Sequence, residues 1–124
     1  MDWREVMGRI RSVCADPYGQ AAAWKGKNGK KVIGWFHYDT PEEIIHASGS
    51  LPLGLLGSTK PLSRCDAHVQ SFICSLVRST MEMGLDGSLS WLDGIVFPQV
   101  CDSAQNLAGV WEKNCPTRYV DSLF

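Results

Sequence analysis

The sequence predicts an α/β domain built on a parallel sheet with helices on both faces. Four short runs that read as strands, 31–38, 51–56, 94–97 and 118–124, alternate with segments of helical period, and the first of them is rich in β-branched and aromatic residues. Strands that alternate with helices favour a parallel sheet joined by right-handed crossovers. The 124 residues, 44% of them hydrophobic, suffice for one domain with a core of its own. We therefore expect a flavodoxin-like or Rossmann-like arrangement, which is incomplete at the C-terminus because no helix follows the last strand.

Charge and hydropathy exclude several classes of protein. Twelve basic residues balance thirteen acidic ones, which argues against a nucleic-acid binder and leaves no polybasic segment for a membrane surface. No apolar stretch approaches the roughly 20 residues that cross a bilayer, and the N-terminus lacks the apolar core of a secretory signal. The five cysteines include no Cys-x-x-Cys pair. An odd number of cysteines without a secretory signal predicts a cytoplasmic protein whose thiols are free or bound to metal.

The first 30 residues are predicted to form an N-terminal helix and a linker. Apolar residues recur at intervals of three and four within 2–14, which predicts a helix with one apolar face. Residues 16–31 contain glycine, proline, asparagine and four lysines, a composition typical of a turn-rich link. We therefore divide the chain into residues 1–30 and an α/β domain at residues 31–124.

The first predicted strand leads into a short helix. Thr40 can cap this helix, Pro41 suits its first position, and Glu43 closes a capping box. Gly49 supplies a left-handed stop. The next strand, 51–56, contains Pro52, which predicts either a position at the edge of the sheet or a late start of the strand.

The longest predicted helix begins at the Ser63-x-x-Asp66 motif and ends near Gly84. Its apolar residues recur with helical spacing and would face the core. After the third strand, Asp102 or Ser103 is expected to cap a further helix. The inward-facing residues are predicted to be Val69, Phe72, Ile73, Leu76, Thr80 and Met83 in the first of these helices and Ala104, Leu107, Ala108 and Trp111 in the second.

Two loops are expected to carry functional residues. In an open α/β sheet, ligands bind beyond the carboxyl ends of the strands, at the point where the strand order reverses. A flavodoxin-like order brings the loops 37–41 and 98–103 to this point. Cys101 lies just before a predicted helix, whose N-terminus favours the thiolate that binds metals or attacks substrates; the alternative is a small residue that fills a tight turn. His37, in the other loop, is a candidate acid or base.

Helical spacing separates the remaining cysteines. Cys65 lies within about 40° of the apolar stripe and is predicted to be a core thiol. Cys74 lies about 140° from Val69, so it is exposed or turned toward a second layer, a ligand or a partner. Arg78, one turn further along, would favour its thiolate. The residues for which we expect structural or surface roles are Cys14, Cys115 and His46.

Four segments carry motifs that occur together, in this order, in one known family. They are Pro41-Glu-Glu-Ile-Ile-His-Ala-Ser-Gly-Ser-Leu-Pro52, Pro61-Leu-Ser-Arg-Cys-Asp-Ala67, Gln70-Ser-Phe-Ile-Cys-Ser75, and Leu92-Asp-Gly-Ile-Val-Phe-Pro98 with Cys101-Asp102. The first is similar to the P-E-E-I-I-x-A-x-G-x-L-P signature of the 2-hydroxyacyl-CoA dehydratases and benzoyl-CoA reductases, the family of the 2-hydroxyglutaryl-CoA dehydratase D-component. The resemblance covers about residues 30–124, which correspond to roughly the first third of a family subunit.

This resemblance implies an iron–sulfur enzyme. Each subunit of the family's heterodimer holds a cluster, typically [4Fe–4S], through three cysteines, and an ATP-dependent activator supplies single electrons for the reduction of an acyl-CoA. The first two cysteine ligands of the family fall on Cys74 and Cys101, whereas the third lies beyond residue 124. The resemblance thus implies the N-terminal segment of a cluster-binding subunit that is apo or inactive by itself. The alternative is a truncated, non-catalytic α/β interaction domain, and dehydration and ring reduction both remain open as the chemistry.

Overall fold

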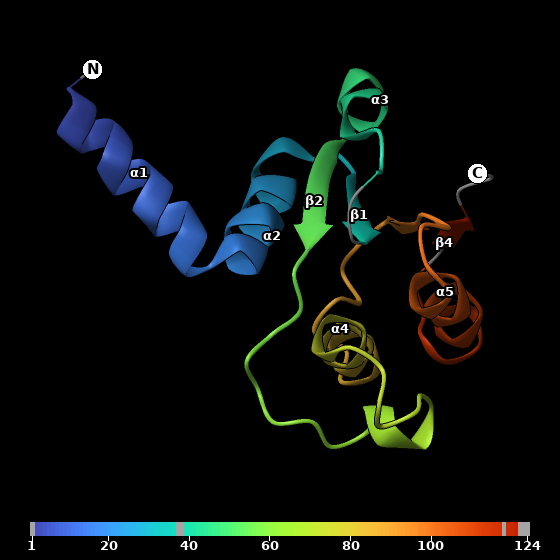
Figure 1. The fold of residues 1–124 in the computed structure, drawn as a ribbon. Coiled ribbons are helices and arrows are strands. Elements are labelled where there is room, and N and C mark those ends of the chain that lie inside the picture. Colours follow the sequence, from blue (N-terminus) through green and yellow to red (C-terminus); the bar gives the residue numbers. More distant parts are fainter. Residues whose placement is uncertain (1, 37–38, 118, 122–124) are drawn as a thin grey trace. The chain divides into compact units, whose positions relative to one another are not determined.

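The computed structural model describes residues 2–36, 39–117 and the backbone of 119–121. It divides into two compact units, Met1–Lys30 and Lys31–Phe124, which are coloured blue and cyan-to-red in Figure 1. The first unit contains helices alone, whereas the second contains the sheet and the remaining helices.

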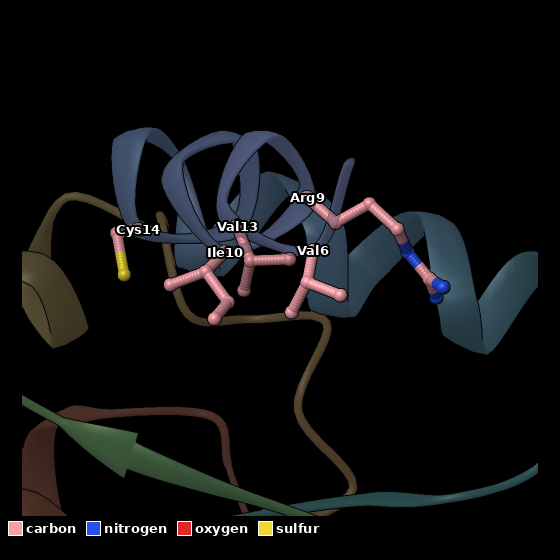
Figure 2. Close-up of a pocket in the computed structure, with 5 residues that line it drawn as sticks. All are labelled: Val6, Arg9, Ile10, Val13 and Cys14. Carbon is pink, nitrogen blue, oxygen red and sulfur yellow. The ribbon is translucent and has the colours of Figure 1, made fainter. Parts of the chain in front are cut away.

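The first unit consists of two helices with very little buried surface. α1 spans Trp3–Ala15 and α2 spans Pro17–Asn28, so the helix predicted at 2–14 is confirmed. Among the described residues of this unit, only Ala21 is buried. The apolar face of α1 is open: Val6, Ile10 and Val13 project to the same side of the helix in Figure 2, and the Val13 side chain is 50% exposed.

The linker predicted at residues 16–31 is wrong, because α2 occupies most of it. Asp16 caps this helix and its carboxylate accepts a hydrogen bond of 2.9 Å from the backbone N–H of Gly19. Pro17 stands in the first turn, and Gly29 ends the helix at φ +63° with its N–H bonded to the Lys25 carbonyl. The proline and the last glycine therefore mark the two ends of a helix rather than a loop.

The second unit contains the parallel sheet that the sequence predicts. Its strands are β1 (Val32–Phe36), β2 (Leu51–Leu55), β3 (Gly94–Phe97) and β4 (Tyr119–Asp121). They are ordered β2-β1-β3-β4 and every pair is parallel. This is the flavodoxin-like order, which confirms the α/β class and the edge position of β2.

The short helix after β1 starts later than predicted. α3 spans Glu42–Ala47, and Pro41 precedes it with a ψ of 77°, outside the helical region. The backbone N–H of Glu42 bonds to the carbonyl of Thr40 at 2.8 Å, and no side chain caps the helix. The predicted capping box is therefore wrong. The predicted stop is confirmed, since Gly49 has a φ of +81°.

The single long helix predicted at 63–84 is also wrong. The structure has a 3₁₀ turn, η1 (Cys65–Ala67), then irregular chain, and α4 begins only at Ser75 and ends at Leu85. Phe72, assigned to the buried stripe, is 86% exposed in the irregular part. The reason is that the first residues of this segment are hydrogen-bonded to the side chain of Glu82 on α4. They lie beside that helix and therefore cannot form its first turns.

The core lies between the sheet and the helices α4 and α5, where α5 spans Asp102–Asn114. α4 and α5 lie side by side. Aromatic rings connect the sheet to α5: the ring centroids of Phe36 and Phe97 are 5.9 Å apart, and those of Phe97 and Trp111 are 5.6 Å apart. Gly84 lets the two helices approach, because a Cβ there would lie 2.6 Å from the Trp111 ring. The inner face predicted for this last helix is confirmed, with Ala104, Leu107, Ala108 and Trp111 all buried.

None of the helices in the described part of the chain has both the length and the hydropathy needed to cross a membrane.

Candidate functional site

The candidate site lies at the carboxyl edge of the sheet, where the strand order reverses between β1 and β3. The strands before and after α4 run parallel, and so do those before and after α5. A Cβ on Gly57, two residues beyond β2, would meet Leu76 and Ser79 in the first turns of α4, and α5 begins five residues beyond β3. Both helices therefore begin at this edge and run back across the sheet. Of the two loops predicted to meet here, 98–103 is fully described. His37, the candidate acid or base of the other loop, lies outside the described residues.

Cys101 is the residue that precedes α5. Its backbone is extended, with φ −155° and ψ 159°, and its thiol accepts a hydrogen bond of 3.4 Å from the backbone N–H of Ala104. The side chain is exposed. The thiol thus caps the helix and is exposed, and a structural role at the turn and a role as a ligand are both compatible with this placement. A negative charge on the sulfur would be stabilised by the same N–H and by the helix dipole.

Cys74 holds the equivalent position at α4. It is the N-cap residue, with φ −56° and ψ 148°, and its exposed side chain caps no N–H group. The exposure predicted for it is therefore found, but for a different reason. Cys74 does not lie on the face of a long helix; it lies just before the first turn, as Cys101 does. Both candidate thiols are thus exposed at the starts of two neighbouring helices on one edge of the sheet.

The other cysteines are placed differently. Cys65 is fully buried, and burial, reinforced by the adjacent Asp66, raises the pKa of its thiol. Cys115 is buried beside Gly84, and burial raises its pKa to about 11. These environments favour the neutral thiol and are typical of structural cysteines. Cys14 is exposed, but on α1 in the first unit.

Arg78 does not serve Cys74 as the sequence suggested. Its guanidinium donates to the carboxylate of Asp66 at 2.6 Å. This hydrogen bond lowers the pKa of Asp66. The pair ties the turn η1 to α4. The guanidinium that was expected to favour the Cys74 thiolate is therefore paired with the carboxylate of Asp66.

Glu82 is a notable residue that the sequence pattern did not reveal. Its side chain is only 4% exposed on α4, yet it carries a carboxylate. Burial raises its pKa, but hydrogen bonds from Arg64, Ser63 and Cys65 outweigh that effect and hold the pKa at about 2. The available signal was a glutamate between two apolar residues, Met81 and Met83, near the end of an amphipathic segment.

A groove lies in the second unit, and neither candidate thiol is among the residues that line it. It has a volume of about 460 Å³ and lies between the segment 67–73 and α5. Its lining includes Ile73, the neighbour of Cys74, and Ser103, which is two residues from Cys101. His68, Gln70 and Asn106 also line it.

The donors at this edge match an iron–sulfur cluster in kind but not in number. Thiolates are the usual ligands of such clusters, which take three or four of them. Across residues 2–36, 39–117 and 119–121, no group of three or more His, Cys, Asp or Glu side chains is arranged to hold a metal. Cys74 and Cys101, the two exposed thiols at this edge, are fewer than the ligands such a cluster takes.

Comparison with known proteins decides the family. Residues 37–122 match the family described as 2-hydroxyglutaryl-CoA dehydratase, D-component. The chain belongs to this family. The match includes both candidate thiols and most of the second unit, so the resemblance inferred from the motifs is confirmed.

Individual relatives extend the match into the first unit. A benzoyl-CoA reductase subunit from Thauera aromatica is 38% identical over 124 residues, which cover 97% of this chain and 32% of that protein. The beta subunit of (R)-2-hydroxyglutaryl-CoA dehydratase from Acidaminococcus fermentans is 37% identical over 104 residues, 83% of this chain and 27% of the relative. The beta subunit of lactoyl-CoA dehydratase from Anaerotignum propionicum is 29% identical over 112 residues, 90% of this chain and 30% of the relative. The chain thus spans about a third of the length of these relatives.

Proposed function

We propose that the chain is the N-terminal part of an iron–sulfur subunit in an enzyme of the 2-hydroxyacyl-CoA dehydratase or benzoyl-CoA reductase type. The observation that carries the proposal is the matched placement of Cys74 and Cys101. Both thiols are exposed, and each directly precedes a helix that begins at the carboxyl edge of the sheet. The buried thiols Cys65 and Cys115 lack this combination.

In this proposal the two thiolates bind two iron atoms of a [4Fe–4S] cluster. The helix N-termini stabilise the negative charge that the thiolates bring, and the backbone N–H of Ala104 already points at the sulfur of Cys101. When bound, the cluster would supply single electrons for the reduction of an acyl-CoA. The protein residues would bind the cluster, orient the acyl-CoA and exclude water, and they would not themselves donate or accept electrons.

The proposal also includes partners. The relatives are named as subunits, which supports a homologous second subunit. An ATP-dependent activator would supply the electrons, an acyl-CoA would be the substrate, and the cytoplasm would be the compartment. Because this chain contributes two thiolates and such clusters take at least three, the isolated 124 residues should be apo and inactive.

The first test compares four cysteine substitutions in the complete enzyme. Cys74→Ser and Cys101→Ser should each abolish stoichiometric binding of iron and acid-labile sulfide, because each removes one ligand. Cys14→Ser is the matched control, since it removes an exposed thiol from α1, and Cys115→Ser removes a buried one; both should retain the cluster. Equal losses in all four variants would contradict the assignment. Retention of iron in the first two would favour the non-catalytic interaction domain instead.

A second test uses the 124-residue chain. Phenylarsine oxide forms a stable adduct only when two thiols can bind one arsenic atom together. We expect a single adduct that joins Cys74 and Cys101, identified by mass spectrometry of the digested protein. Anaerobic treatment with iron and sulfide should give no stable stoichiometric cluster. If the arsenical joins neither of these cysteines, the two thiols do not converge and the proposed site is wrong.

A further inference from the structure

A buried carboxylate connects the chain that leads to Cys74 with the middle of α4. Glu82 is 4% exposed and lies between Met81 and Met83, which are buried as well. A charged carboxylate in such surroundings is costly unless hydrogen bonds replace its water. The donors that bind the Glu82 carboxylate therefore show which part of the chain this buried charge holds in place.

Three consecutive residues donate hydrogen bonds to the carboxylate of Glu82. One carboxylate oxygen accepts the Ser63 hydroxyl at 2.7 Å. The other accepts the backbone N–H groups of Ser63 at 3.0 Å and of Arg64 and Cys65 at 2.9 Å each. A carboxylate that gathers successive N–H groups in this way fixes the backbone that carries them, because releasing the segment would leave the buried charge unpaired.

Two further contacts hold the same stretch against α4. The guanidinium of Arg64 donates to the carbonyl of Leu85 at 2.9 Å, and Arg78 bonds to Asp66 at 2.6 Å. The attachment points on α4 are thus residues 78, 82 and 85, which are spaced four and three residues apart and share one side of the helix. The stretch 63–66 is fixed along more than one turn of α4.

The chain between this attachment and Cys74 is short. Only residues 67–73 separate Asp66 from Cys74, and five of them line one side of the groove against α5. Their two ends are fixed on the same helix, one by Glu82 and its neighbours and the other by the start of α4 at Ser75. The position of this side of the groove therefore depends on the attachment of residues 63–66.

We propose that Glu82 is a positioning residue of the candidate cluster site. By binding residues 63–65 it fixes the segment 67–73, and through this segment it sets the position of the Cys74 thiol relative to Cys101. This inference rests on the proposed function of these two cysteines. Glu82 does not touch a ligand; it acts through the segment that it holds.

The first experiment measures whether Glu82 holds the segment locally. Glu82→Gln keeps the size of the side chain but removes the charge and turns an N–H₂ group toward the donors. Labelling of each cysteine by a maleimide is followed by mass spectrometry in the 124-residue chain. In this variant Cys65, buried in the attached segment, should react about tenfold faster relative to Cys115. Cys115, buried between α4 and α5, reports any loss of global stability. Cys14, which is exposed, gives the labelling rate of an accessible thiol. The matched control variant is Glu112→Gln, which changes a glutamate on the exposed side of α5.

Equal acceleration at Cys65 and Cys115 would overturn the inference, because Glu82 would then contribute to global stability alone. Unchanged labelling of Cys65 would overturn it as well.

The second experiment tests positioning. The rate at which phenylarsine oxide joins Cys74 to Cys101 should fall about tenfold in Glu82→Gln, because the effective concentration of one thiol near the other decreases, and it should be unaffected in Glu112→Gln. Release of Cys65 with an unchanged rate of joining would show that Glu82 anchors the segment but does not position the site. Absence of the adduct in the unsubstituted chain would instead refute the proposed site, whereas the Cys65 labelling would still report the attachment.

Discussion

α1 in the first unit and α5 in the second are both amphipathic helices of 13 residues, but they bury very different amounts of surface. α5 packs four residues of its apolar face into the core, and Trp111 on that face is fully buried. α1 buries none of its residues, and Trp3 on its apolar face is 66% exposed. The comparison shows that helical periodicity predicts a helix and an apolar face, but not whether the described chain covers that face.

The largest expected difference concerns the two tryptophans. Trp111→Ala removes a ring that contacts Phe97 and the surface of Gly84, and it should lower the free energy of unfolding by about 3–5 kcal/mol. Trp3→Ala removes the same side chain from an exposed position and should cost less than about 1 kcal/mol. Urea denaturation followed by circular dichroism measures both. Similar losses would mean that the apolar face of α1 is as well packed as that of α5.

A smaller effect is expected from the contact that lets α4 approach α5. In Gly84→Ala the new Cβ would lie 2.6 Å from the Trp111 ring and 2.7 Å from the Cys115 sulfur, so the helices must separate, at a cost of about 1–3 kcal/mol. Gly109→Ala is the control, because a Cβ on this part of α5 meets no atom within 4 Å, and it should stabilise the helix by roughly 0.5–1 kcal/mol. The two unfolding midpoints should move in opposite directions. A stabilising Gly84→Ala would contradict the close packing.

Acid should weaken the second unit through Glu82. The pKa of Glu82 in the fold, about 2, lies below the 4.5 of an unperturbed glutamate. The carboxylate therefore stabilises the fold above about pH 4.5, and this contribution is lost as the pH falls toward 2. Glu82→Gln should lower stability at pH 7 by about 1–3 kcal/mol and should reduce the dependence on pH between 5 and 3, when urea midpoints are compared across that range. A variant with the same pH dependence as the original chain would exclude Glu82 as the group responsible.

The smallest effect is expected at the helix starts of the first unit. Asp16→Ala removes the side chain that bonds to Gly19 at the start of α2 and should cost about 1 kcal/mol of helix stability. Asp2→Ala removes the residue before α1, whose side chain makes no capping hydrogen bond, and should cost less. The helical content measured by far-ultraviolet circular dichroism should fall more for Asp16→Ala. The reverse order would contradict the assignment of residues 16–28 to a capped helix.

The strands and the class of fold were predictable because each depends on local composition. The runs that form β1, β2 and β3 are short and apolar, with glycine or proline in or near them. These local features do not depend on contacts with the rest of the fold. Their parallel arrangement followed from the helices between them. The prediction of a linker at 16–31 was wrong because it rested on the glycine and proline content of the segment. Pro17 and Gly29 instead lie at the two ends of α2, where these residues start and stop a helix.

The long helix at 63–84 failed for a tertiary reason. Its sequence has helical spacing throughout, but the backbone N–H groups of residues 63–65 bind the side chain of Glu82, which is 17 to 19 residues away. A local pattern does not reveal such a distant acceptor. As a result, the exposure of Cys74 was one of the predicted alternatives, but its position at the start of α4 was not foreseen.

The sequence by itself determined the parallel α/β class, the order of the elements and the motifs that mark the family, because spacing, capping residues and signature residues are all written along the chain. Only the tertiary structure decided that Cys74 and Cys101 occupy equivalent positions before two neighbouring helices, and that the carboxylate of Glu82 accepts the hydrogen bonds of residues 63–65. These outcomes depend on contacts between residues far apart in sequence, where a buried charge must find its hydrogen-bond donors and an apolar face must find a partner.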